Sequence, residues 1–440
     1  MNHTIKKAAF HTLGCKVNQY ETEAITELFS ERGYEIVPFE EQADVYVVNT
    51  CSVTNIGDRK SRQMIRRARK TNPEAVIVVT GCYAQTAAEE VLNIDGVNLV
   101  IGTAGRGRIA ELAESLDHTA KLNMVGDIMH NHEFEELKIT KYEDRTRAFI
   151  KIQEGCSQFC SYCIIPYARG PIRSRNEEEV LAEMRELAAN GFTEIILVGI
   201  HVASYGLDLK NTSLEQLLKK AEQIDGIRRL RLSSIEPMTL NRDFVEKIKM
   251  SKKLCPHFHI SLQSGCDETL KRMNRKYTTA QFKEVVDGLR EAFPDCAVTT
   301  DIMVGFAGET EEEFRHTVDF VKEIRFADAH VFQYSRRKGT PAAEMENQIA
   351  PEIKEQRSKT ILAETQKAHE EFLNRHLGRE MEVLFEQRAK DRMFEGKTAN
   401  YITVHAPSDE DLSGQFRMVR LCKVKNGRII GKILDEIPKK

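Results

Sequence analysis

Three cysteines stand close together near the middle of the chain, within the segment EGCSQFCSYCIIPYARG. Cys156, Cys160 and Cys163, which we call the clustered cysteines, are spaced by three and two residues and follow a predicted strand. A structural zinc site takes four protein ligands, and no fourth Cys or His occurs within the next thirty residues. Three thiolates on a four-iron cluster leave one iron open to a further ligand, as a reactive centre requires. The spacing therefore predicts an iron-sulfur centre, with zinc as the alternative.

A second set of cysteines is spread over the first hundred residues. Cys15, Cys51 and Cys82, which we call the strand-end cysteines, lie in FHTLGCKVN, VVNTCSVTN and VVTGCYAQ. Each follows an apolar run that predicts a strand and precedes small or polar residues. Parallel strands end at one edge of their sheet, where α/β folds place ligands, so the three thiols should meet there. The alternative is that they are core residues, because free cysteine behaves as a small hydrophobic side chain.

The elements that must position these cysteines begin with a small α/β domain, predicted over residues 1–118. Its strands, each followed by a polar amphipathic stretch, are expected at residues 8–13, 44–50, 75–80 and 97–101. This alternation is typical of a parallel sheet. Residues 119–145 are polar and without a clear period, and they are predicted to form a linker.

A second α/β series is predicted over residues 146–374. Strands are expected at 148–153, 194–198, 229–235, 257–263, 298–304 and 330–334, with helices such as 177–190, 214–224, 280–292 and 311–324 between them. Six β/α units fall short of the eight that close a barrel of this type, so we expect an open partial barrel. Its active site should lie at the carboxyl ends of the strands.

The character of the sequence changes after a long predicted helix at residues 351–377. Residues 375–440 are predicted to form a small all-β module with strands at 380–385, 401–405, 415–425 and 428–434. Asn426 and Gly427 between apolar runs indicate a tight hairpin. The basic strands favour a nucleic-acid-binding barrel, and a stabilising cap is the alternative.

The composition of the 440 residues, with 41% hydrophobic and 30% charged residues and a net charge of -3, fits a soluble globular protein of several domains. No apolar stretch reaches the ~18 residues of a membrane span, and the first thirty residues lack a signal-peptide core, which predicts a cytoplasmic protein. In that reducing compartment, ten cysteines indicate metal chemistry and not disulfides. Residues 59–70 hold seven cations, which predict either a phosphate contact or a solvated helix face.

The clustered cysteines, with Tyr162 before the last of them, resemble the motif of the radical S-adenosylmethionine (SAM) enzymes. With the strand-end cysteines and the segments HISLQSGCDETLKRMNRKYT, TDIMVGFAGETEEEF and YSRRKGTPAA, the chain resembles the methylthiotransferases of that superfamily over nearly its whole length. The resemblance implies an α/β fold made of a small parallel α/β domain, an open partial (β/α)6 barrel and a C-terminal TRAM-type RNA-binding barrel. It also implies two [4Fe-4S] clusters, an auxiliary one on the strand-end cysteines and a SAM-binding one on the clustered cysteines.

The resemblance also assigns further residues, although it implies no catalytic side chain beyond the cluster ligands. SAM contacts are expected from Tyr162, Gly199, His201, Ser234, Glu236, Gln263, Asp301, Gly305 and Gly308. Glu236 and Asp301 have an alternative, because buried carboxylates are commonly paired with arginine. RNA contacts are expected from Arg417, Arg420, Lys423, Lys425 and Arg428. The sequence departs from the family where Ala307 replaces a usual proline and where YSRRKGTP replaces a YSPRPGTP-like segment.

The segment TLGCKVNQYETEAI resembles the branch that acts on threonylcarbamoyladenosine. This implies conversion of N6-threonylcarbamoyladenosine at position 37 of tRNA to its 2-methylthio derivative, with one SAM supplying the methyl group and a second the radical. The expected partners are the tRNA anticodon stem-loop and an external electron donor, with no membrane. Arg336, Arg337 and Lys338 are candidates for binding the carboxylate of the substrate. Alternatives are an isopentenyladenosine substrate, an aspartate of a ribosomal protein, or a non-catalytic iron-sulfur carrier or RNA-binding regulator.

Overall fold

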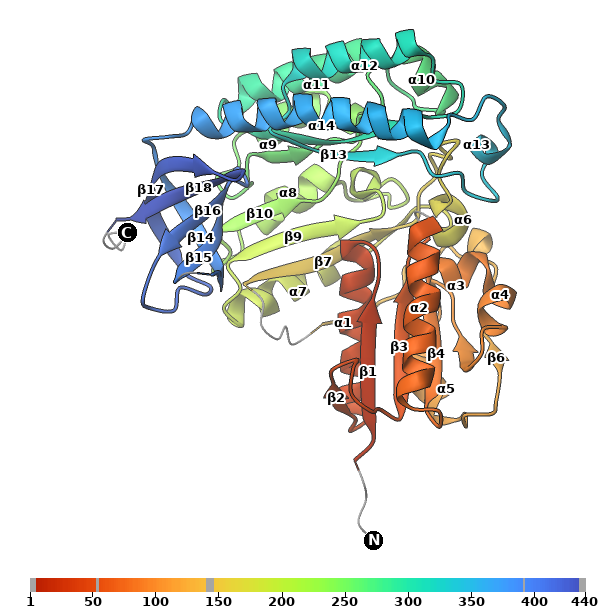
Figure 1. Cartoon of the computed structure of the whole chain (residues 1–440). Coiled ribbons are helices and arrows are strands. Elements are labelled where there is room, and N and C mark those ends of the chain that lie inside the picture. Colours follow the sequence, from red (N-terminus) through yellow and green to blue (C-terminus); the bar gives the residue numbers. More distant parts are fainter. Residues whose placement is uncertain (1–4, 53–54, 140–145, 391, 435–440) are drawn as a thin grey trace.

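The computed structural model describes residues 5–52, 55–139, 146–390 and 392–434. The N-terminal unit and the C-terminal barrel lie at different ends of a larger central unit (Figure 1). Each has its own hydrophobic core. Within the described residues, no helix is both long enough and apolar enough to cross a membrane.

The N-terminal unit is built on a parallel sheet in the order β2-β1-β3-β4-β5-β6. The four predicted strands are β1 (Lys7–Thr12), β3 (Val45–Thr50), β4 (Val76–Gly81) and β5 (Val97–Val100). The central strands β3 and β4 are buried along their whole length, which explains their continuous apolar runs. The helices are α1 (Lys16–Glu31), α2 (Asn55–Thr71), α3 (Cys82–Thr86), α4 (Ala88–Leu92) and α5 (Ile109–Glu114).

Two edge strands of this sheet were not predicted. β2 (Glu35–Val37) and β6 (Leu122–Asn123) span three and two residues, too few to show the alternation of a strand. β6 pairs with β5, so part of the predicted linker belongs to the sheet. The same stretch contains the 3-10 turn η2 (Ile128–His130), and its Leu137 and Ile139 pack against Tyr20 of α1.

The central unit is an open partial barrel, as predicted. Six parallel strands form two sheets joined by bridges, with the short antiparallel β8 (Arg173–Ser174) beside the first strand. The six are β7 (Arg147–Glu154), β9 (Glu194–Gly199), β10 (Arg229–Leu232), β11 (His257–His259), β12 (Ala297–Val304) and β13 (Asp328–Gln333). Because β11 holds only three residues, the predicted strand at 257–263 was too long.

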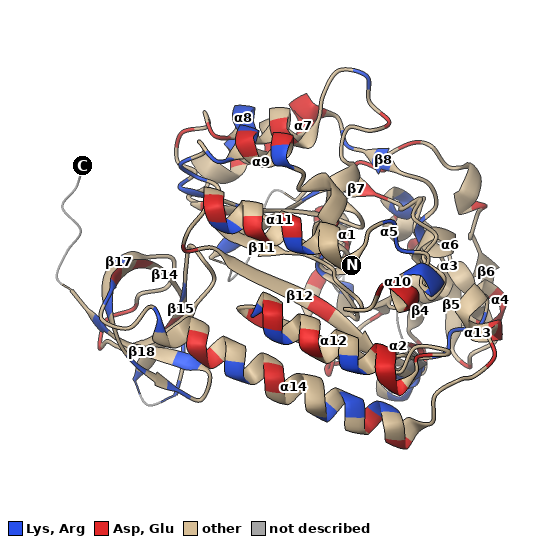
Figure 2. Ribbon diagram, turned by 90° about the horizontal axis from the view of Figure 1, so that it is seen from above, with Lys and Arg blue, Asp and Glu red and all other residues tan. Residues whose placement is uncertain are grey.

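Helices cover the outer face of the partial barrel (Figure 1). They are α7 (Glu177–Ala189), α8 (Leu214–Ala221), α9 (Arg242–Ile248), α10 (Asp267–Arg272), α11 (Thr279–Ala292), α12 (Glu311–Ile324) and α14 (Pro351–Asn374). The short helices α6 (Ile165–Arg169) and α13 (Pro341–Glu344) lie at the carboxyl ends of the strands (Figure 1). Thr278 and Thr310 start α11 and α12 with capping boxes, which satisfy free backbone N–H groups. Both charge signs are interspersed along α11, α12 and α14, as expected of solvated helix faces (Figure 2).

The inner face of the barrel is unusually polar. Ile150, Leu197 and Phe258 pack into the core under the helices, so alternate residues of the same strands face inward. Inward positions include Arg147, Lys151, Glu194, Arg231, His257, His259 and Asp301. Val17 of α1 packs against Ile196 and Val198 of β9, so the N-terminal unit covers part of this face.

The C-terminal unit is a closed barrel in the order β14-β15-β16-β18-β17. Its strands are β14 (Glu380–Arg388), β15 (Met393–Thr398), β16 (Thr403–Pro407), β17 (Phe416–Lys425) and β18 (Arg428–Ile433). β15 was not predicted, since it contains Gly396 and alternates weakly. Asn426 and Gly427 have φ of 51° and 68°, so the predicted tight hairpin is confirmed.

This barrel is docked onto the amino ends of the central strands. Arg147 and Arg229 pair with Glu386 and Glu382 across the contact. The Tyr401 ring stacks on the imidazole of His257, with centroids 4.4 Å apart and planes at 4°.

Candidate functional site

The clustered cysteines occupy the loop between β7 and α6. The loop is held by backbone hydrogen bonds, among them Cys156 N–H to the Gly170 carbonyl at 3.0 Å and Cys163 N–H to the Cys160 carbonyl at 2.9 Å. Gly155 starts the loop with φ of 75°, and a Cβ there would lie 1.8 Å from the Pro171 carbonyl oxygen. Only glycine fits this position, so the sequence EGC fixes how the loop leaves the strand.

The three thiols are free and lie in a protected environment with one cation at hand. Burial raises the pKa of Cys156 to about 11 and that of Cys163 to about 12, with the neighbouring thiols acting in the same direction. The Arg275 guanidinium donates to Cys160 Sγ at 3.4 Å. A bound metal replaces the thiol proton outright, and a nearby cation stabilises the resulting negative charge. This donor set fits an iron-sulfur cluster.

The strand-end cysteines lie at the carboxyl ends of three neighbouring strands. Cys15 follows β1 and caps α1, Cys51 follows β3, and Cys82 follows β4 as the first residue of α3. A Cβ built on Gly14 would lie 3.0 Å from Cys51 Sγ, so the Cys15 loop touches Cys51. Burial raises the pKa of Cys82 to about 12, and the thiols of Cys51 and Cys15 add to the rise. The structure brings all three to one edge of the sheet.

A cavity of about 240 Å³ lies next to the clustered cysteines. Three of the predicted cofactor residues, Tyr162, Gln263 and Asp301, line it together with Cys163, Ile164, Ile165, Met303, Phe332, Gln333, Tyr334 and Ser335. Gln263 has φ of 66°, a left-handed conformation at the point where the chain leaves β11. The cavity therefore joins the clustered cysteines to the carboxyl ends of β11, β12 and β13.

The remaining predicted cofactor residues do not line this cavity. The backbone N–H of His201, in the loop after β9, donates to Gln153 Oε1 at 2.7 Å, and Gly199 packs against the same side chain. Ser234 is exposed beyond β10. Gly305 and Gly308 have φ of 69° and 74° and form a turn against Lys354 of α14 and Arg272 of α10.

Glu236 is paired with arginine, the alternative that the sequence left open. Its carboxylate accepts from Arg275 Nη2 at 2.9 and 3.1 Å, and the same guanidinium contacts Cys160 Sγ. Glu236 therefore orients the cation beside the clustered cysteines. Arg275 was missed by sequence reasoning, although it lies in the segment LKRMNRKYT that carried the resemblance.

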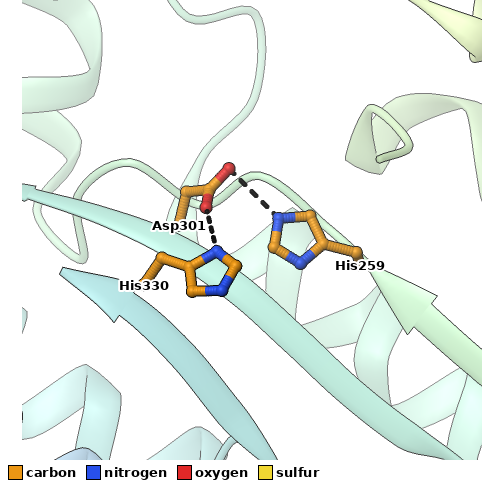
Figure 3. Close-up of side chains that lie close together, drawn as sticks. All are labelled: His259, Asp301 and His330. Atoms are coloured by element: carbon orange, nitrogen blue, oxygen red, sulfur yellow. Dashed lines mark hydrogen bonds and ion pairs between the residues drawn. The ribbon is translucent and has the colours of Figure 1, made fainter. Parts of the chain in front are cut away.

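Asp301 has two imidazole partners and no arginine among the described residues. His259 Nε2 lies 3.1 Å and His330 Nδ1 3.2 Å from its two carboxylate oxygens (Figure 3). Burial alone would raise the pKa of Asp301, but the two hydrogen bonds outweigh it and hold that pKa well below the usual range. The bond to Asp301 in turn raises the pKa of His330. One carboxylate thus links three inner strands at the cavity wall.

The cations proposed to bind a substrate carboxylate are not all available. Arg337 is buried and donates to both oxygens of Asp58 in α2 and to Ser52 Oγ. Arg336 donates to the Ala343 carbonyl, and Lys338 is exposed. The prediction for Arg337 was therefore wrong, because its charge is used in a contact with the N-terminal unit.

The five predicted RNA-binding cations lie on β17 and β18. Lys423 and Lys425 are exposed, and neither has an ion-pair partner among the described residues. Arg420 pairs with Glu380 at 2.6 Å, and Arg428 lies 3.6 Å from Glu395. Arg417 is half-buried and folds back on Gln415. The lysines are thus the most open of the set.

Comparison with known proteins assigns the two α/β units to described families. A model of the radical SAM superfamily matches residues 150–321, which include the clustered cysteines. A model described as uncharacterized protein family UPF0004 matches residues 7–102, which include the strand-end cysteines.

Similar proteins extend over nearly the whole chain. The threonylcarbamoyladenosine tRNA methylthiotransferase MtaB of Bacillus subtilis (strain 168) is 44% identical, over 98% of this chain and 97% of its own length. The protein of the same name from Aquifex aeolicus (strain VF5) is 39% identical, over 94% of this chain and 100% of its own. A tRNA-2-methylthio-N(6)-dimethylallyladenosine synthase of Acetivibrio thermocellus is 35% identical, over 98% of this chain and 91% of its own length.

Among solved structures, the radical S-adenosylmethionine methyltransferase TsrM from Kitasatospora setae resembles the fold. Its TM-score is 0.56 at 17% identity, over 77% of each chain. At this identity the likeness concerns the fold alone.

Proposed function

This chain belongs to the tRNA methylthiotransferases of the radical SAM superfamily, and on that premise we propose that it converts N6-threonylcarbamoyladenosine in tRNA to the 2-methylthio derivative. The choice of substrate rests on the 44% identity to the Bacillus subtilis protein, against 35% for the dimethylallyladenosine synthase. The observation that carries the proposal is the pair of cysteine sets, which approach each other where α3 contacts α6. We take position 37, beside the anticodon, as the target.

We propose that the clustered cysteines hold the SAM-binding [4Fe-4S] cluster and the strand-end cysteines a second one. When bound, the first supplies the electron that cleaves SAM and the second supplies the sulfur. Arg275 donates to Cys160 and is held by Glu236, so it stabilises thiolate charge at the first site. Tyr162, Gln263 and Asp301 form the wall against which SAM would lie. The close packing of α1 on the inner face excludes water from that side.

The substrate would approach the cavity at the carboxyl ends of the barrel strands. The inward cations Arg147 and Arg231 lie at the opposite end of the strands, where they pair with Glu386 and Glu194 and do not line this cavity. Threonylcarbamoyladenosine carries a carboxylate that the dimethylallyl base lacks, and we propose that the exposed Lys338, in the loop after β13, binds it. We propose the anticodon stem-loop as the bound part of the tRNA, with Lys423 and Lys425 as phosphate contacts.

Three further parts of the proposal follow from the substrate and the fold. An external electron donor must reduce the first cluster, and the reaction takes place in the cytoplasm, where tRNA is. We place the functional divisions at residues 1–118, 119–145, 146–374 and 375–440. The first division ends after the strand-end cysteines, and the third holds the cavity.

The test is an anaerobic assay of the reconstituted protein on anticodon stem-loops bearing either modified base. We expect methylthiolation of the threonylcarbamoyl substrate, and equal or better turnover of the isopentenyl substrate would refute the substrate assignment. Cys82→Ala should still release methionine and 5'-deoxyadenosine but form no methylthio product. Cys422→Ala, which removes an exposed thiol on β17, is the matched control and should keep both activities. A non-catalytic carrier would release no 5'-deoxyadenosine.

A further inference from the structure

A buried arginine connects the two sets of cysteines. Arg169 is the last residue of α6, the helix that begins two residues after Cys163. Its side chain is fully buried, and Nε donates to Cys82 Sγ at 3.3 Å. The segment that carries the clustered cysteines therefore places a cation directly on a strand-end cysteine.

Every N–H of this guanidinium has an acceptor. Nη1 donates to Glu21 Oε1 at 2.5 Å and Glu154 Oε1 at 2.8 Å. Nη2 donates to Asn18 Oδ1 at 2.5 Å and Glu21 Oε2 at 3.0 Å. A guanidinium has five N–H donors in a rigid plane, and these four bonds leave only Nε–H for the sulfur. The direction of the Nε–H bond toward Cys82 is thus fixed by its partners.

The buried cations around Arg169 outnumber the carboxylates that pair with them by one. Arg106, Lys151 and Arg169 converge on the buried carboxylates Glu21 and Glu154, and Arg106 also pairs with Glu135. These three cations and three carboxylates balance. Arg173 is also buried beside them, yet it donates only to backbone carbonyls and has no ion-pair partner among the described residues. This network thus holds one cation more than its carboxylates balance, and its Arg169 is the member that contacts Cys82 Sγ.

We propose that Arg169 is a positioning residue for the second cluster, and that its Nε–H donates to the Cys82 thiolate and raises the reduction potential of that cluster. The inference rests on the proposed function, which makes Cys82 an iron ligand. Hydrogen bonds to ligating sulfurs withdraw electron density from the iron, so they make a cluster easier to reduce. Because Arg169 belongs to the loop and helix of the first site, the same bond fixes the distance between the two sites.

The experiment uses the full chain with all three clustered cysteines replaced by alanine, so that only the second cluster is present. Its midpoint potential is measured by an anaerobic redox titration followed by electron paramagnetic resonance. Arg169→Lys keeps the charge but loses the planar fork, and Arg169→Gln loses the charge. We expect both to shift the midpoint to lower potential, Arg169→Gln by more. Arg106→Lys is the matched control, because it belongs to the same network without touching sulfur, and its midpoint should stay unchanged.

A second measurement avoids any change at Arg169. With arginine labelled by 15N at Nε, pulsed electron paramagnetic resonance of the same protein should detect a nitrogen coupled to the reduced cluster. Absence of this coupling, an unchanged midpoint in the iron-loaded Arg169 variants, or an equal shift in Arg106→Lys would each overturn the role of Arg169 alone. A parent protein that holds no iron would overturn the second cluster, and with it the proposed function as well.

Discussion

The contact of Arg337 with Asp58 gives a prediction about how the two α/β units hold together. Arg337 lies in the loop after β13, and Asp58 lies in α2, 279 residues earlier in the chain. The guanidinium also donates to Ser52 Oγ at 2.8 Å, directly beside Cys51. The perturbation is Arg337→Met, which leaves the Asp58 carboxylate buried without its cation.

The magnitude follows from burial. The Arg337 and Asp58 side chains are 9% and 13% exposed. Removing one partner of a buried ion pair costs about 3 to 5 kcal/mol, because the other charge stays in the interior unpaired. Since both groups keep slight contact with solvent, we expect about 3 kcal/mol for Arg337→Met and for Asp58→Asn. The double variant leaves no unpaired charge in the interior, so it should be less destabilised than the sum of the two single variants. We expect this difference, the coupling energy, to be about 2 kcal/mol.

The assay is urea unfolding of the metal-free protein, followed by far-ultraviolet circular dichroism because the chain has no Trp. Amide hydrogen exchange of residues 56–60 and 335–340 reports whether the loss is local to this contact. Arg108→Met is the control, since its pair with Glu111 is exposed and screened by solvent, so its loss should leave the unfolding curve nearly unchanged. The reasoning would be refuted if the free energy of unfolding of each single variant lay within about 0.5 kcal/mol of the parent. It would also be refuted if the destabilisation of the double variant equalled the sum of the two single variants.

Three other outcomes are expected. Reconstituted protein should bind about eight irons, and about four when the clustered cysteines are replaced by alanine; complete loss of iron would contradict two sites. Asp301→Asn should lower the pKa of His330, because the bond to Asp301 raises it. The contribution of this bond to stability is complete below the pKa of a free histidine and is lost as pH rises through the raised pKa of His330. A His330 titration, followed by nuclear magnetic resonance, that is unchanged in Asp301→Asn would disprove the role of Asp301. Lys423→Ala with Lys425→Ala should weaken tRNA binding and flatten its salt dependence by about one slope unit per lost phosphate contact, leaving SAM cleavage intact; an unchanged slope would exclude these lysines.

The sequence predicted those strands and helices that have long, regular patterns. β3 and β4 are apolar throughout because they are buried on both faces, and α11 and α12 are marked by caps and amphipathic periods. β2 and β6 were not predicted because strands of three and two residues are too short to show an alternation of polar and apolar side chains. β15 was not predicted because Gly396 interrupts its alternation. Pattern carries information only where an element is long enough to repeat.

The candidate site was predictable to the same extent. The cysteines were found because spacing and strand ends are local features. Arg169 and Arg275 were not found, and Arg337 was misassigned, because the acid or sulfur that each contacts lies far away in sequence. A cation in a loop looks the same whether it faces a cavity or a buried carboxylate, and only the tertiary structure separates the two.

Helix α1 limits how the molecule can move during turnover. Its first turn follows Cys15, Val17 packs on the inner face of β9, and Glu21 is the meeting point of Arg106, Lys151 and Arg169. A hinge that swung the N-terminal unit away from the central barrel would break the buried ion pairs of Glu21 with Lys151 and Arg169. Opening between the two units would therefore also separate the Arg169 guanidinium from Cys82 Sγ.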